Sequence, residues 1–132
     1  MKRKFDPITG KSGAIIESVM NSDDLPKDED IQFKIRLCVE EIVENVVNYA
    51  YDNGCGYIEV ETSATPELWT ISFKDAGVPF NPLEKPDPDV TLSLNDRPVG
   101  GLGIFLCKQM MDSLAYEHKN GCNILTMSKK IR

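Results

Sequence analysis

Two polar residues in a long helical pattern could bind a cation or take part in proton transfer. Glu41 and Asn45 are spaced one helical turn apart. At about 100° per residue, both fall on the edge of an apolar stripe. That stripe consists of Ile35, Cys38, Ile42, Val46 and Tyr49. The pair is either a solvated polar flank or a site for a hard cation or a phosphate, since hard metals take oxygen ligands.

A second candidate is Asp75, at the end of a predicted strand. It has the same parity as Trp69, Ile71 and Phe73. If the strand continues to Asp75, the carboxylate faces the core and must find hydrogen-bond donors. It would then form the floor of a pocket and accept from a ligand amino group. Alternatively, the strand stops at Lys74 and Asp75 caps a turn.

A third candidate is the glycine-rich run Gly100-Gly101-Leu102-Gly103, which precedes apolar helical residues. Glycines at a helix start let backbone N–H groups approach an anion, although they also mark flexible entries. A dinucleotide-binding fingerprint does not fit, because its last glycine is missing and no strand is predicted just before the run.

The elements that must position these residues are predicted from the spacing of apolar residues and from the residues that mark turns and helix ends. Helices are predicted from Gly13 to Asn21, from Pro26 to about Tyr51, and from Gly100 to about Ser113. Strands are predicted at 58–62 and 69–74, joined by a hairpin loop, and at 114–119 and 123–129, joined across Asn120-Gly121. Five prolines make 78–99 a long irregular loop. This order predicts an α+β two-layer sandwich.

Composition narrows the class of protein. With 132 residues and 41% apolar residues, we expect one domain, 1–132. The net charge of -6 argues against direct nucleic-acid binding. No apolar run approaches 18 residues, so no membrane span is expected, and no membrane is expected as a partner. The four cysteines lack a CxxC pair, which favours reduced thiols in a cytoplasmic protein.

In combination, the segments resemble the GHKL ATPase superfamily. Residues 41–50 resemble its N box, 75–79 its first glycine box, 100–105 its second, and 121–127 its closing strand. Within the superfamily they are similar to the small anti-sigma-factor serine/threonine kinases of the RsbW and SpoIIAB type. The resemblance implies the Bergerat fold, a mixed, mostly antiparallel sheet covered on one face by helices, with a lid at about 78–100.

The resemblance also implies ATP and Mg²⁺ as cofactors. Asn45 would bind Mg²⁺, Glu41 would orient or deprotonate the attacking hydroxyl, and Asp75 would accept from the adenine amino group. The remaining residues implied at the nucleotide are Tyr49, Gly77, Pro79, Gly100, Gly101, Gly103 and Asn123. Tyr49 stands where the family often has histidine, and Arg97 and Lys108 are candidates for the γ-phosphate contact.

The implied activity is that of a protein kinase acting on a serine of a STAS-type anti-anti-sigma protein, together with sequestration of a sigma factor. Relatives commonly form homodimers. One alternative is a nucleotide-gated sequestering module that transfers nothing. Retention of Glu41 favours the kinase, because sequestration needs no base. Another alternative, a detached histidine-kinase ATPase domain, would need a separate phosphoacceptor helix pair.

Overall fold

The alternating segments of the chain pair into one five-stranded sheet. The computed structural model describes residues 1–5, 12–49, 56–84 and 102–131. The sheet order is β1-β2-β3-β5-β4, and every pair of described strands is antiparallel. The strands are β1 (Lys2–Phe5), β2 (Ile58–Ala64), β3 (Leu68–Asp75), β4 (Ser113–Lys119) and β5 (Cys122–Lys130). The α+β sandwich is thus confirmed, but the described strands lack the expected mixed pairing.

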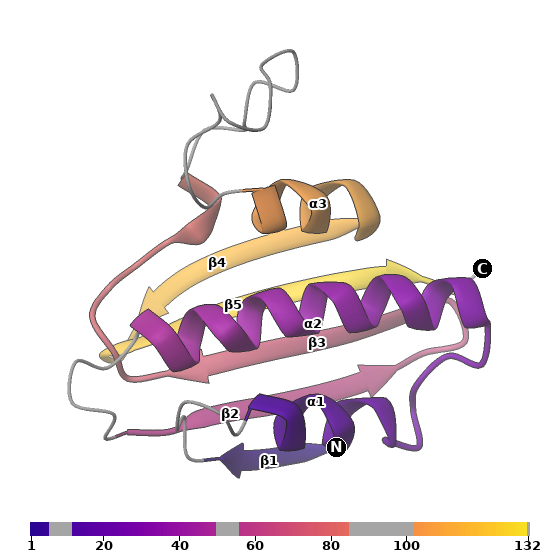
Figure 1. Cartoon of the computed structure of the whole chain (residues 1–132), viewed down its shortest axis with the longest axis horizontal. Helices are drawn as coiled ribbons and strands as arrows, with labels where there is room; N and C mark the ends of the chain where they lie inside the picture. Colours follow the sequence, from indigo (N-terminus) through magenta and orange to yellow (C-terminus); the bar gives the residue numbers. More distant parts are fainter. Residues whose placement is uncertain (6–11, 50–55, 85–101, 132) are drawn as a thin grey trace.

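Three helices lie on one side of this sheet (Figure 1). They are α1 (Ser12–Met20), α2 (Glu29–Tyr49) and α3 (Leu102–Met110), and a 3-10 turn η1 spans Pro82–Glu84. α2 is the central helix and contacts both α1 and α3. The core between the two layers contains Trp69, Ile71 and Phe73 from the inner face of β3. Their alternation continues to Asp75, which is also buried.

The helix ends differ from those predicted. α2 begins at Glu29 rather than Pro26, and the Asp28 carboxylate caps it by accepting from the backbone N–H of Ile31 at 3.0 Å. α3 ends at Met110 rather than near Ser113, because the chain joins the sheet there. The backbone N–H of Asp112 already donates to the Ser128 carbonyl.

One strand was not predicted. β1 consists of Lys2, Arg3, Lys4 and Phe5, which show no apolar alternation. It is an edge strand paired to β2. The Lys2 and Lys4 ammonium groups lie within 4 Å of the Glu59 carboxylate. The strand is therefore specified by its partner rather than by its own pattern.

The predicted hairpins are confirmed. β4 and β5 meet at Asn120 and Gly121, whose φ angles of 54° and 77° are both left-handed, as a two-residue hairpin turn requires. Of the predicted loop and lid, the structure describes 78–84, while 85–100 lie outside the described residues. Among the described helices, none is long and apolar enough to span a membrane.

Candidate functional site

A cavity lies between the carboxyl-terminal half of α2 and the ends of β3 and β5. It brings together Asn45, Asp75 and Asn123, which are far apart in the sequence. The other lining side chains are apolar or aromatic: Ile42, Val46, Phe73, Val78, Phe80, Pro82, Tyr116 and Leu125. A mostly apolar cavity with a few convergent polar groups is the usual form of a small-molecule site.

Asp75 and Asn123 face each other across β3 and β5. They are paired in the sheet register, and only 6% and 7% of their surfaces are exposed. The Asn123 Nδ2 donates to Asp75 Oδ1 at 3.0 Å, and the backbone N–H of Gly77 donates to the same oxygen at 2.9 Å. Asp75 is therefore both the last buried residue of its strand and the acceptor that closes the following turn.

Asn123 connects the sheet to the segment after β3. Its Oδ1 accepts from the Tyr116 hydroxyl and from the backbone N–H of Phe80. Its Nδ2 also donates to the carbonyl of Val78 at 2.9 Å. The polar end of the cavity is thus a network rather than a set of independent groups.

Glu41 and Asn45 both lie half-buried at the edge of the α2 core stripe, as the helical periodicity predicts. The structure places them against different neighbours. Asn45 lines the cavity with Asp75, whereas Glu41 lines a groove between α2 and α3 with Gly103 and Leu106. The two sites share one helix and are separated by one turn.

The first turn of α3 packs directly on Glu41. A Cβ atom built on Gly103 would lie 2.0 Å from Glu41 Cδ, so glycine alone fits there without moving the carboxylate. The amino-terminal end of a helix favours negative charge, and its free N–H groups can hold an anion. A phosphate bound at this end of α3 would therefore lie close to the Glu41 carboxylate.

The other predicted site residues are distributed as follows. Tyr49 is the last residue of α2. Gly77 forms the turn with Asp75, and Pro79 is exposed between Val78 and Phe80. Gly100, Gly101 and Arg97 lie outside the described residues. Lys108 lines a separate hollow with Leu83 and Leu114.

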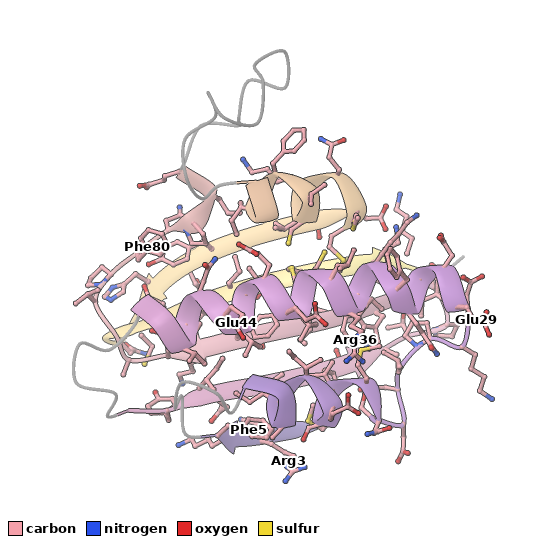
Figure 2. All side chains as sticks on the ribbon, in the orientation of Figure 1. Arg3, Phe5, Glu29, Arg36, Glu44 and Phe80 are labelled. Atoms are coloured by element: carbon pink, nitrogen blue, oxygen red, sulfur yellow. The ribbon has the colours of Figure 1, made fainter. Side chains whose placement is uncertain are left out.

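Phe80 and Tyr116 are cavity residues that the sequence did not single out. Phe80 belongs to the segment after β3 and lines the cavity with Asn45 and Val46. Figure 2 shows it near the end of α2 that carries Glu44. Tyr116 comes from β4 and donates to Asn123. Its parity with the partly buried Leu114 was a signal, because alternate residues of an edge strand share one face.

The described cysteines are free and buried thiols: Cys38, Cys107 and Cys122. Hydrogen bonding with Cys38, together with burial, raises the pKa of the Cys107 thiol well above its usual range. The same bond lowers the pKa of Cys38. Both residues line the groove that contains Glu41.

The chain matches one known family over most of its length. Residues 12–129 match the family described as "Histidine kinase-like ATPase domain". The match includes Glu41, Asn45, Asp75, Gly103 and Asn123.

Two curated relatives are serine kinases by name. The chain is 28% identical over 99 residues to the serine/threonine-protein kinase BtrW of Bordetella bronchiseptica, covering 74% of this chain and 70% of that protein. It is 29% identical over 102 residues to the serine-protein kinase RsbW of Bacillus cereus, again covering 74% of this chain but 63% of the relative.

Solved structures share the fold at low identity. A histidine kinase domain from Erythrobacter litoralis EL346 aligns with a TM-score of 0.61 and 14% identity, over 89% of this chain and 57% of that one. The catalytic domain of histidine kinase ThkA aligns with a TM-score of 0.57 and 13% identity, over 98% and 97%.

Proposed function

Because the chain belongs to the histidine kinase-like ATPase domain family, we propose that it binds ATP and transfers the γ-phosphoryl group to a protein serine. The observation that carries this proposal is the joint lining of one cavity by Asn45 and Asp75, next to the Glu41–Gly103 contact. The serine kinases among the relatives support the choice of acceptor. The whole of residues 1–132 would act as one ATP-binding domain.

In this proposal, the adenine base occupies the apolar cavity and its amino group donates to Asp75. Within the described residues, Asp75 Oδ2 receives no hydrogen bond, whereas Oδ1 receives two. A free carboxylate oxygen suits an amino group and opposes the keto oxygen of guanine. Gly77 lets the base approach the backbone. Tyr49, close to Asn45 in the sequence, and Pro79, close to Gly77, are proposed as further residues at the nucleotide.

The residues present fit a magnesium ion carried by the nucleotide. Asn45 offers one oxygen ligand at the cavity, and no cluster of three or more acidic, cysteine or histidine side chains suited to a metal is found among the described residues. Mg²⁺ is commonly held by one or two protein oxygens plus substrate phosphates. Asn45 would hold the ion, which, when bound, neutralises charge on the phosphates.

Glu41 is proposed as the general base. The serine oxygen forms a bond to the γ-phosphorus, the bond from that phosphorus to the β–γ bridging oxygen breaks, and ADP leaves. Glu41 takes the serine proton. Gly103 and the two preceding glycines, Gly100 and Gly101, would donate backbone N–H groups to the phosphates. Arg97 remains the candidate cation for the γ-phosphate, because Lys108, the other residue expected there, lines a separate hollow.

The proposed partners are a STAS-type anti-anti-sigma protein as phosphoryl acceptor and a sigma factor as the protein held inactive, as in the RsbW-type kinases that the sequence resembles. The chain spans about 63% of the length of the RsbW relative. Both partners and a cytoplasmic location are therefore proposed.

Phosphotransfer with labelled ATP to a STAS-domain protein from the same genome tests the proposal. Glu41→Gln should lower the transfer rate by about 10²- to 10⁴-fold, the usual contribution of a general base. Its ATP affinity should stay within about twofold. Glu29→Gln, at the far end of α2 (Figure 2), is the matched control and should transfer at the wild-type rate. Equal transfer by wild type and Glu41→Gln would refute the role of Glu41.

A further inference from the structure

The hydrogen-bonding capacity of Asn123 is filled by the protein itself. A carboxamide can accept two hydrogen bonds and donate two. Oδ1 accepts from the Tyr116 hydroxyl and from Phe80 N at 3.2 Å. Nδ2 donates to Asp75 Oδ1 at 3.0 Å and to the Val78 carbonyl at 2.9 Å. In this arrangement Asn123 has no donor or acceptor left for a nucleobase.

The chemistry of its neighbours fixes which way the amide faces. A backbone N–H such as that of Phe80 can only donate, and a carbonyl such as that of Val78 can only accept. Turning the amide over would set two donors against each other and two acceptors against each other. The Tyr116 hydroxyl, which lies beside Oδ1, must therefore act as a donor.

The two donors to Oδ1 come from different kinds of structure. Tyr116 belongs to β4, which is paired along its whole length with β5. Phe80 belongs to the segment after β3, where Val78 and Phe80 are 59% and 43% exposed. Asn123 thus ties this segment to the sheet, and Tyr116 is the sheet-borne contact that holds Asn123.

We propose that Tyr116 and Asn123 are positioning residues for adenine recognition. They orient the Asp75 carboxylate and hold residues 77–80 as one wall of the cavity, without forming a hydrogen bond to the nucleobase. The proposal rests on the proposed function, in which the adenine amino group donates to Asp75. It gives Asn123, which the sequence resemblance places near the adenine, an indirect role in binding the base.

Tyr116→Phe removes one donor to Asn123 while keeping the ring. ATP affinity should fall by about 3- to 10-fold, the range for one buried hydrogen bond. Affinity for purine riboside triphosphate, which lacks the 6-amino group, should fall by less than affinity for ATP, because that ligand depends on the wall of residues 77–80 but not on the orientation of Asp75. Equal losses for both nucleotides would overturn the proposal, since a general structural defect weakens both.

Tyr57→Phe is the matched control. Its hydroxyl contacts Cys122 Sγ at 3.4 Å, next to Asn123, but Tyr57 is not among the described residues that line the cavity. This variant should bind both nucleotides like wild type.

A measurement on the nucleotide-free protein separates this inference from ATP binding. The Phe80 amide donates to Asn123, so its hydrogen exchange, followed by NMR, reports directly on that contact. Exchange should be several-fold faster in Tyr116→Phe than in wild type or Tyr57→Phe. Unchanged exchange would overturn the positioning role of Tyr116. If the wild type binds no ATP, the proposed function fails and adenine recognition with it, while exchange still decides whether Tyr116 holds Asn123.

Discussion

Asp75 combines two roles that the sequence presented as alternatives. Strand β3 continues to Asp75 and buries it, as the parity with Phe73 predicts. Its Oδ1 also accepts from the Gly77 N–H, as a turn-forming aspartate does. The same residue can do both because Oδ1 alone closes the turn, and the hydrogen bonds from described residues leave Oδ2 without a donor.

Asp75→Asn should weaken ATP binding by about 10- to 100-fold, because the new amide oxygen must accept from Asn123 and Gly77, which leaves an NH2 donor facing the adenine amino group. Calorimetric titration with Mg-ATP measures this change. Asp23→Asn, at an exposed position before α2, should bind ATP like wild type. Undiminished binding by Asp75→Asn would remove Asp75 from the site.

The close approach of Gly103 to Glu41 predicts how an alanine at position 103 would affect stability. Alanine in a helix is normally favoured over glycine by up to about 1 kcal/mol. Here the new Cβ would collide with the Glu41 carboxylate, so Gly103→Ala should raise the free energy of unfolding, measured with urea, by less than this amount. In a Glu41→Ala background, Gly103→Ala should raise the free energy of unfolding by the full amount.

Gly13→Ala in α1 is the control for the Gly103 variant, because a Cβ at Gly13 meets nothing within 4 Å. It should give the same change in unfolding free energy with or without Glu41. If the effect of Gly103→Ala on the unfolding free energy were also the same with and without Glu41, the close packing of α3 on that carboxylate would be disproved.

At the scale of elements, α2 determines which groups can meet. Its apolar stripe buries Ile35, Cys38 and Ile42 against the sheet, and this leaves Glu41 and Asn45 at the border. Periodicity alone predicts this placement. It does not predict that the two residues line different hollows, because that depends on where α3 and β3 end.

The junction between α3 and β4 should contribute a pH-dependent part of the stability. The backbone N–H of Lys130 donates to Asp112 Oδ2 at 2.6 Å and lowers the pKa of Asp112 below its ordinary value. A lowered pKa in the folded state stabilises the protein above the unfolded pKa, and this contribution is lost as the pH falls through the folded pKa.

Asp112→Asn should therefore cost up to about 1 kcal/mol at pH 7, a modest value because the carboxylate is partly exposed. The difference from wild type should shrink as the pH falls below about 4. Urea unfolding at a series of pH values measures it. A difference that stays constant across this range would show that the Asp112 charge contributes nothing.

At the scale of the whole molecule, the two-layer architecture could be predicted because most elements carry their own pattern. β2 and β3 alternate, the β4–β5 turn is Asn120-Gly121, and α2 has one apolar face. β1 could not be predicted in this way, because its basic residues are specified by pairing with β2. Tyr116 was missed for a related reason: its hydrogen bond to Asn123 forms only when β4 pairs with β5.

Nucleotide binding should stabilise the entire domain. A ligand present at about 100 times its Kd adds about 2.7 kcal/mol to the free energy of unfolding. For a chain of this size, that corresponds to a rise in Tm of about 5 to 10 °C. Mg-ATP should produce this shift and Mg-GTP should not. Equal shifts with both nucleotides would argue against base selection by Asp75.

A crystal structure with Mg²⁺ and a non-hydrolysable ATP analogue tests most directly whether one nucleotide joins α2 to the ends of β3 and β5. The adenine amino group is expected within hydrogen-bond distance of Asp75, with Mg²⁺ on the Asn45 carboxamide oxygen. A nucleotide bound elsewhere, or one whose base makes no contact with Asp75, would contradict the proposed site.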